Sequence, residues 1–300
     1  MIVSTDNMTP EVILLVIATG AVALRFHARK MSKLGWWTDD WLSLVALVFL
    51  AGYMSTYFWT EAHHLSGSDI AKMSIPQTIE ILKITFADIY LMSVTITFSR
   101  LSIIFLYNRI FGVYDRFRVA LWIMGALTMG WVITIIILNT FRCKPIALAY
   151  NPLLKGQCLN MTTLFVATES LNCALDLVLV LLPLWRISFL HLSIGDRIGL
   201  GFVFLTGGFV CITSILRIVF TYNINTSASG FWLTLQLSFA VICACLPTLR
   251  RYLPKHISTP SAVKSYLFSL KLGKTGADGS NDHLKDSRKD SHDDKASSGV

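Results

Sequence analysis

Long stretches of apolar residues alternate with short polar segments along most of this chain. The stretch from Val119 to Phe141 and the stretch from Gly230 to Leu249 contain no charged residue. A helix that crosses the hydrocarbon core of a bilayer needs about 20 mostly apolar residues, and both stretches meet this requirement. The pattern predicts an all-α bundle of seven transmembrane helices. We expect the spans at residues 11–28, 41–61, 84–107, 119–141, 163–185, 198–220 and 230–249.

The segments on either side of the predicted membrane domain, residues 11–252, are more polar. Residues 1–10 are expected to form a short extracellular N-terminus, and residues 273–300, rich in Asp, Lys, Ser and Gly, a disordered cytoplasmic tail. Residues 253–272 form either an amphipathic helix on the inner leaflet or an unstructured basic stretch. The first apolar stretch is interpreted as a span and not as a signal peptide, because no Lys or Arg precedes it and basic residues follow it directly.

Composition also favours a membrane protein. Hydrophobic residues make up 54% of the chain and charged residues 15%, and the mean hydropathy is +0.59. Soluble domains carry about 25% charged residues. A soluble single-core enzyme is therefore not expected, and neither is disorder over most of the length.

The distribution of positive charge predicts the orientation in the membrane. Lys and Arg near the ends of the predicted spans number thirteen on one side and five on the other. Because cytoplasmic loops carry an excess of Lys and Arg, we expect the N-terminus outside and the C-terminus inside, in the plasma membrane. Three Asn-X-Ser/Thr sequons lie on the predicted outer side, which makes Asn7, Asn160 and Asn225 candidate glycosylation sites.

Two of the six cysteines lie outside the predicted spans. Cys143 and Cys158 both fall in the outer loop between the fourth and fifth spans. An oxidising compartment permits a disulfide there, and we expect one; the alternative is two unrelated thiols. The other cysteines are expected to pack as small apolar residues and not to bind a metal.

Ionisable residues inside a span are costly and are therefore candidates for function. With about 1.5 Å of rise per residue, four polar residues of different spans lie at a similar depth below the outer surface. We predict that they line a water-accessible ligand pocket in which the arginine faces one or two carboxylates. These ligand-pocket candidates are Asp88, Glu169, Arg217 and Gln236.

A deeper pair of charges lies in the third and fifth spans. Arg100 and Asp176 are at matching distances from the inner side, and Asn172 lies one turn from Asp176 on the same helix face. We predict an intramembrane ion pair between Arg100 and Asp176, because an unpaired charge at that depth would cost several kcal/mol. Its role is open between a switch that rearranges on activation and a static contact between helices.

Three charged residues lie near the inner ends of the first two spans. Arg25 is expected to extend its charged end to the inner interface while its aliphatic part stays in the membrane. Asp39 and Asp40 either bond basic residues of the inner loops or cap the start of the second span. Capping is preferred, because carboxylates favour helix N-termini.

The sequence lacks the residues that several kinds of chemistry require. A retinal Schiff base needs a lysine inside the bundle, and no predicted span contains one. No metal-ligand cluster, no Ser/His/Asp set within the spans and no phosphate-binding glycine loop is apparent. We therefore expect that the protein is not an enzyme and has no catalytic residues, cofactor, metal or nucleic-acid partner.

Short motifs follow one another in a set order. They are Gly35 to Trp41, Arg100 to Phe111, Cys143-Lys144-Pro145, Gly156-Gln157-Cys158, Asn172 and Asp176 before Leu181-Leu182-Pro183, and Cys243 to Pro247. Together they resemble the fungal rhodopsin-domain family of integral membrane proteins, which is named for a satratoxin-cluster member and includes the fungal pathogenicity-type seven-helix receptors. The resemblance covers about residues 10–255.

This resemblance implies a seven-helix, receptor-like membrane protein of a filamentous fungus, in a family with several members encoded near secondary-metabolite genes. The chain departs from some relatives in two ways. Few residues precede the first span and they include no cysteine-rich domain, which argues against an extracellular adhesion role. Thr38 interrupts the usual spacing between the glycine-aromatic and Asp-Asp parts of the first motif.

Different functions remain open at this point. The leading hypothesis is a receptor of the G-protein-coupled type, which senses an unknown small extracellular ligand and acts on a heterotrimeric G protein. The alternative is a transporter or accessory membrane protein that handles a small metabolite of a biosynthetic cluster. A structural scaffold is a third. In each case the lipid bilayer surrounds the helices.

Overall fold

The computed structural model describes residues 8–31, 35–63, 74–112, 114–187, 194–222 and 226–249. Within these ranges the chain is helical apart from one small hairpin. The predicted segments 253–272 and 273–300, together with the sequon residues Asn7 and Asn225, lie outside the described residues. The helices are α1 (Met8–Met31), α2 (Thr38–Ala62), α3 (Ile75–Phe111), α4 (Asp115–Thr140), α5 (Met161–Ile187), α6 (Ile194–Tyr222) and α7 (Thr226–Leu249).

Each predicted span corresponds to one of these helices, but α3 begins well before the predicted start at residue 84. The reason is local. The backbone N–H and the hydroxyl of Ser74 donate to Oε1 of Gln77 at 3.1 and 2.8 Å, and a proline stands in the first turn. Both features stabilise a helix N-terminus, so α3 starts at Ile75 and includes polar residues that precede the apolar stretch.

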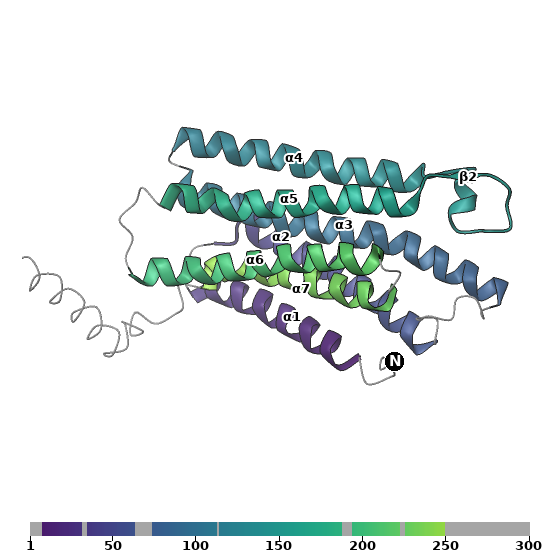
Figure 1. The fold of residues 1–300 in the computed structure, drawn as a ribbon. Helices are drawn as coiled ribbons and strands as arrows, with labels where there is room; N and C mark the ends of the chain where they lie inside the picture. Colours follow the sequence, from purple (N-terminus) through teal and green to yellow (C-terminus); the bar gives the residue numbers. More distant parts are fainter. Residues whose placement is uncertain are drawn as a thin grey trace, which may run out of the picture. The chain divides into compact units, whose positions relative to one another are not determined.

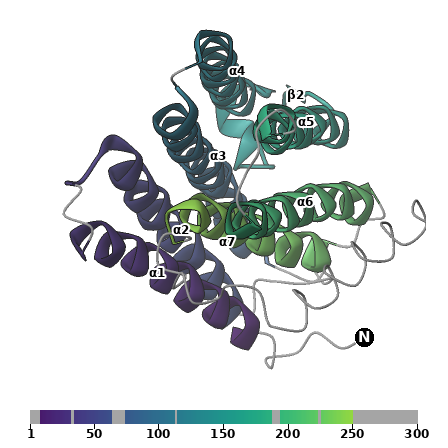
Figure 2. The same cartoon turned by 90° about the vertical axis from the view of Figure 1, so that its left-hand side faces the viewer.

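The helices lie side by side, and successive helices run in opposite directions (Figure 1). Viewed along the bundle, α7 lies near the centre (Figure 2), where it packs against α1, α2, α3 and α6. Helix α3 packs against α2, α4 and α7. Polar side chains of α3 and α7 therefore fall in the interior of the bundle.

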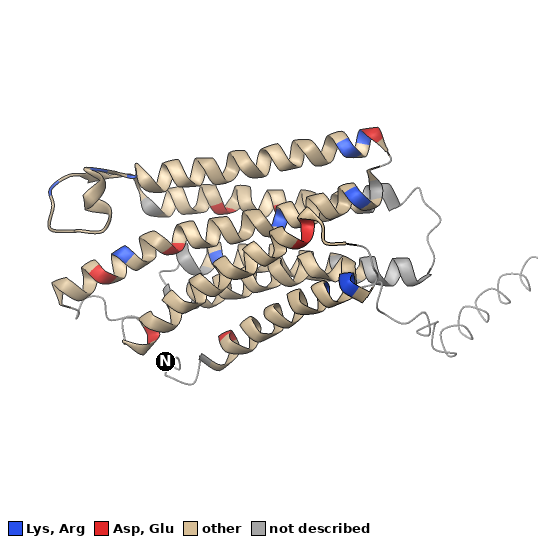
Figure 3. Cartoon of the chain, turned by 180° about the vertical axis from the view of Figure 1, so that it is seen from behind, with Lys and Arg blue, Asp and Glu red and all other residues tan. Residues whose placement is uncertain are grey.

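The outer face of the bundle is apolar and the interior is partly polar. On α4, Trp122, Leu127 and Ile133 are exposed, whereas Ser93 and Thr95 of α3 are buried. Charged residues lie mainly near helix ends, with few along the middle of the helices (Figure 3). A water-soluble protein places its large apolar residues inside, so this distribution is typical of helices that contact lipid and pack through small polar residues.

Six helices of the described part, α1 to α5 and α7, are long and apolar enough to cross a membrane. In α6 the apolar stretch that the structure describes, Phe204–Val219, is shorter. The architecture is thus that of an all-α membrane protein.

A small disulfide-bonded hairpin connects α4 to α5. Strand β1 (Cys143–Lys144) pairs antiparallel with β2 (Gln157–Cys158), and a short 3-10 helix, η3 (Ile146–Ala149), lies between them. Cys143 and Cys158 are partners in the register and their sulfurs are bonded, as expected from the sequence. The hairpin lies at the end of the bundle where α1 begins (Figure 1).

Residues on either side of the hairpin anchor it. Arg142 donates a hydrogen bond to the carbonyl of Ala149 at 3.2 Å, and its guanidinium lies 5.5 Å from the centre of the Phe86 ring of α3. Burial lowers the pKa of Arg142 from its ordinary value. The exposed Asn160 accepts hydrogen bonds from the backbone N–H groups of Thr162 and Thr163 at 3.1 and 3.3 Å, at the start of α5.

Candidate functional site

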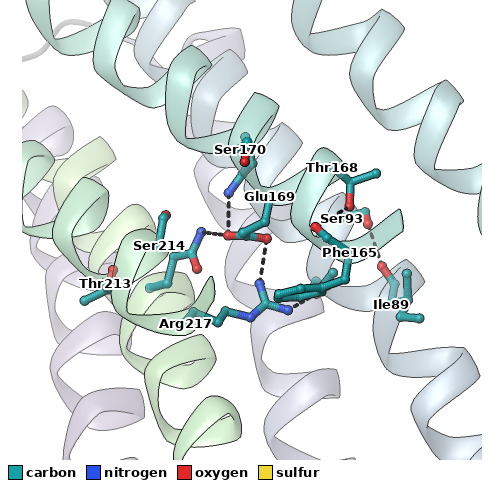
Figure 4. A network of polar contacts seen from close by, with 12 residues as sticks. Ile89, Ser93, Phe165, Thr168, Glu169, Ser170, Thr213, Ser214 and Arg217 are labelled. Atoms are coloured by element: carbon teal, nitrogen blue, oxygen red, sulfur yellow. Dashed lines mark hydrogen bonds and ion pairs between the residues drawn. The ribbon is translucent and has the colours of Figure 1, made fainter. Parts of the chain in front are cut away.

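One buried ion pair joins α5 and α6. Nη1 of Arg217 donates to Oε2 of Glu169 at 2.9 Å, and the two side chains are 6% and 5% exposed. The Arg217 guanidinium also lies over the ring of Phe165, 4.9 Å from its centre (Figure 4). Oε1 of Glu169 accepts a hydrogen bond from Nε2 of Gln236 on α7 at 3.0 Å. The structure therefore brings together three of the four ligand-pocket candidates.

A second buried ion pair joins α3 and α5. Nε of Arg100 donates to Oδ1 of Asp176 at 2.8 Å. Nη2 of Arg100 donates to the backbone carbonyl of Asn172 at 2.9 Å and also to the side-chain oxygen of Asn172. The ring of Trp131 on α4 lies over the guanidinium at 5.1 Å. The structure thus places in contact the two charges whose depths match in the sequence.

Asn172 connects the two ion pairs. Its Nδ2 donates to Oε1 of Glu169 at 3.1 Å, while its Oδ1 accepts from Arg100. Depth along the helices placed the pairs in separate layers, whereas the structure joins them into one network that runs from Asp176 to Arg217. Two positive and two negative charges balance within it, which avoids the large cost of an uncompensated charge in a low-dielectric interior.

The fourth candidate, Asp88, takes a different position. Its carboxylate accepts a hydrogen bond from the hydroxyl of Thr56 on α2 at 2.6 Å. Asp88 therefore belongs to the contact between α2 and α3. Its partner is a hydroxyl, whereas the sequence suggested that Arg217 faces one or two carboxylates of this group.

A cavity of about 40 Å³ lies beside the Arg100–Asp176 pair, between α3, α5, α6 and α7. Its polar lining includes both members of this pair together with Ser99 and Gln236. A single water needs roughly 10–15 Å³ of such space, so the cavity is large enough for a small polar group. Of the four ligand-pocket candidates, Gln236 lines the cavity. The cavity lies at the depth of Arg100 and Asp176, the deeper of the two layers of polar residues that the sequence predicts.

Four charged residues form a second buried group, here called the inner cluster: Arg25, Arg29, Asp39 and Asp40. Arg25 donates to Asp39 and Asp40 at 2.7 and 2.8 Å, and Arg29 donates to the same two carboxylates at 2.6 and 3.2 Å. The expectation that Arg25 extends to the membrane interface is wrong, because its side chain is 0% exposed. Two carboxylates within reach satisfy its donors inside the protein.

The inner cluster also contacts the two central helices. Arg25 donates to the backbone carbonyl of Ala244 on α7, and Ser102 of α3 donates to the carbonyl of Asp39 at 2.8 Å. Asp40 both binds the arginines and caps α2, since its Oδ2 accepts the backbone N–H of Trp37 at 3.2 Å. The two alternatives considered for the aspartates therefore occur together.

A sequence signal for the inner cluster existed. Arg25 and Arg29 are four residues apart and so share one face of α1, and two adjacent aspartates follow after a short connection. Bonds from the aspartates to basic residues of the inner loops were one of the two expected alternatives, and the structure adds Arg25, which was expected at the membrane interface.

The network and the cavity offer hydrogen-bond donors and acceptors inside a largely apolar bundle. Small-molecule sites also combine apolar walls with a few fixed polar groups, and a cavity of about 40 Å³ has room for a group of only a few non-hydrogen atoms. Across the ranges that the structure describes, no group of three or more His, Cys, Asp or Glu residues is placed to hold a metal ion. The chemistry that the described site can supply is hydrogen bonding and charge.

Comparison with known proteins identifies relatives. The profile described as Fungal rhodopsin domain matches residues 24–255. Satratoxin biosynthesis SC1 cluster protein 4 of Stachybotrys chartarum is 32% identical over 162 residues, which are 53% of this chain and 60% of the relative. Wortmanamides biosynthesis cluster protein C of Talaromyces wortmannii is 27% identical over 248 residues, 77% of this chain and 66% of the relative.

A third relative, the SAT4 family membrane protein of Emericella nidulans, is 27% identical over 159 residues, 50% of this chain and 40% of the relative. The chain thus spans less than two thirds of the length of these three relatives. No solved structure matches the chain.

Proposed function

The chain belongs to the fungal rhodopsin domain family, and we propose that it is an accessory membrane protein of secondary metabolism that binds a small metabolite inside its helix bundle. It is a multi-pass membrane protein with helices suited to the lipid bilayer. Two of the relatives are named as proteins of biosynthesis clusters, which supports a role beside a biosynthetic pathway.

The observation that carries the proposal is the cavity at the Arg100–Asp176 pair. It borders the charge-balanced network and is lined by residues of four helices. Polar groups are costly to bury among membrane helices, and those that occur there mark functional sites by default. In this proposal the metabolite contacts Arg100 and Gln236, and the protein binds it without transforming it.

The proposed orientation places the start of α1 and the disulfide hairpin outside the cytoplasm, in the plasma membrane, with α6 as a seventh span. The excess of Lys and Arg on the opposite side supports this orientation. An oxidising compartment for the Cys143–Cys158 disulfide agrees with it.

Deletion of the gene in its native host tests the proposal. The secondary metabolites of the culture medium and of the cells are compared between the deletion strain, the strain complemented with the wild type and the strain complemented with Arg100→Met. We expect the deletion to change the amount or the location of at least one metabolite, and the wild type but not Arg100→Met to restore it. Unchanged metabolites in the deletion strain would contradict the proposal.

A Ser238→Ala complementation provides the control for this experiment. Ser238 is buried on α7 but does not line the cavity, so this variant should restore the metabolites. Uptake or release of the affected metabolite by vesicles that contain the purified protein alone would identify a transporter and not an accessory protein.

A receptor of the G-protein-coupled type is the second candidate. One observation favours it: the cavity touches α3, α5, α6 and α7, so a bound ligand contacts several helices and can bias their relative positions. Ligand-dependent nucleotide exchange on a heterotrimeric G protein α subunit would support the receptor, and its absence together with a metabolite phenotype would favour the accessory role.

A further inference from the structure

Three polar groups around the cavity make no hydrogen bond to another group of the described chain. They are Nη1 of Arg100, Oγ of Ser99 and Oε1 of Gln236. Their residues are 2%, 1% and 0% exposed, and all three line the cavity. A buried donor or acceptor without a partner costs about 1–3 kcal/mol, so three such groups around one space point to an occupant that bonds them.

The hydrogen bonds that these side chains already make show which kind of partner each unpaired group requires. Nε and Nη2 of Arg100 are engaged by Asp176 and Asn172, which leaves Nη1 as a donor that requires an oxygen acceptor. Nε2 of Gln236 is engaged by Glu169, so its Oε1 requires an O–H or N–H donor. The hydroxyl of Ser99 can serve either as donor or as acceptor.

The charges beside the cavity are already paired. Asp176 compensates Arg100 at 2.8 Å, and Glu169 compensates Arg217 at 2.9 Å. An anionic occupant would bring a third negative charge close to Asp176, and a cationic one a further positive charge close to Arg100. Because an uncompensated buried charge is strongly unfavourable, the site favours an uncharged molecule.

Apolar side chains form most of the remaining wall, among them Ile96, Ile103, Leu179 and Val210. Such walls contribute binding energy in proportion to the apolar surface that the occupant buries. Water alone would satisfy the three polar groups but would gain nothing from these side chains.

We propose that the cavity binds a small uncharged molecule, of about the volume of three waters, that carries a carbonyl oxygen for Nη1 of Arg100 and Oγ of Ser99 and a hydroxyl for Oε1 of Gln236. This ligand class rests on the proposed function, which it makes more specific. Hydroxyketones with short alkyl arms are the simplest members of the class.

The test uses the full chain in lipid nanodiscs and three probes of similar size. Hydroxyacetone has a carbonyl and a hydroxyl on adjacent carbons and is small enough for a cavity of about 40 Å³, butanone has a methyl group in place of the hydroxyl, and propanoate is charged. The unfolding temperature is measured against the concentration of each probe, since a ligand that binds the folded state raises it. We expect hydroxyacetone to bind about fivefold more tightly than butanone, as the loss of one hydrogen bond predicts, and propanoate to cause no specific shift.

Two matched variants separate the cavity from the rest of the bundle. Ser99 and Ser238 are both buried, and within the described chain neither hydroxyl has a hydrogen-bond partner, but only Ser99 lines the cavity. Ser99→Ala should weaken hydroxyacetone binding about fivefold, because it removes one hydrogen bond to the carbonyl oxygen, and Ser238→Ala should leave binding unchanged. Ala240 lines the cavity, so Ala240→Leu should fill the space and abolish the hydroxyacetone shift.

Equal binding of hydroxyacetone and butanone, tighter binding of propanoate, or no binding of any probe would overturn the proposed ligand class. An equal shift for wild type and Ala240→Leu would do the same, because it would show partition into lipid. These outcomes are distinct from a failure of the proposed function, which is decided by the metabolites of the deletion strain.

Discussion

Arg25 and Arg100 show what a buried guanidinium needs from its surroundings. The side chain presents five N–H donors in fixed directions. Arg25 directs its donors to α2 and α7, and Arg100 directs its donors to Asp176 and Asn172 on α5. At the scale of single residues, therefore, each buried arginine holds other helices in place as well as neutralising a carboxylate.

The first prediction compares the two arginines of the inner cluster. We expect Arg25→Met to destabilise the protein by about 3–5 kcal/mol, the usual effect of removing one partner from a buried pair. Arg29→Met should cost less, because the Arg29 side chain is 8% exposed and Arg25 still pairs with both aspartates. Unfolding of the purified variants by a denaturing detergent measures both values. Equal costs would show that the bond from Arg25 to α7 contributes nothing.

The second prediction concerns the Arg100–Asp176 pair. Arg100→Gln and Asp176→Asn are each expected to destabilise by about 3 kcal/mol. The double variant should lose less than the sum of the single variants, because each single change leaves the other charge without its partner. The same unfolding measurement on all three variants provides the coupling energy. Additive losses would mean that the two residues do not interact.

At the scale of elements, the hairpin between α4 and α5 is held by one covalent bond and a few polar contacts. The Cys143–Cys158 disulfide closes a loop with a sequence separation of 15 residues. Packing of α4 against α5 also keeps the two ends of this loop together. The disulfide therefore constrains a loop that the helices already constrain in part.

The third prediction follows from this redundancy. Replacing both Cys143 and Cys158 by alanine should lower the stability of the bundle by less than the roughly 3 kcal/mol expected for an otherwise free loop of this length. Proteolysis between β1 and β2 should become faster. Limited proteolysis with mass spectrometry, alongside thermal unfolding, distinguishes the local effect from the global one. Cys173→Ala, a change at a free cysteine of α5, is the control that should leave the hairpin protected.

At the scale of the whole molecule, the orientation in the membrane depends on the side from which each helix enters it. The start of α1 and the hairpin lie at the same end of the bundle (Figure 1). The fourth prediction is that a tag before α1 is accessible on intact cells, whereas a tag after residue 300 becomes accessible only after permeabilisation. Detection of both tags on the same side would contradict a bundle of seven spans with the proposed orientation.

Local features of the sequence were enough to predict several parts of the structure. Apolar length identified the helices, and the position of Cys143 and Cys158 outside the spans identified the hairpin bond. The earlier start of α3 was also present in the sequence, as the Ser74 and Gln77 capping residues, but hydropathy alone does not detect a cap. For the candidate site, depth along a helix suggested the Arg100–Asp176 contact.

The sequence by itself determined that this chain forms long apolar helices for a membrane, because apolar length is a property of each segment alone. Apart from the Arg100–Asp176 pair, which matching depths predicted, only the tertiary structure decided which polar groups meet. Spacing along a helix specifies the depth of a residue but not the direction in which neighbouring helices turn. For that reason Asp88 lies with Thr56, Asn172 joins two ion pairs, and Arg25 is enclosed by Asp39 and Asp40. The cavity is likewise a product of packing, since residues of four helices form its walls.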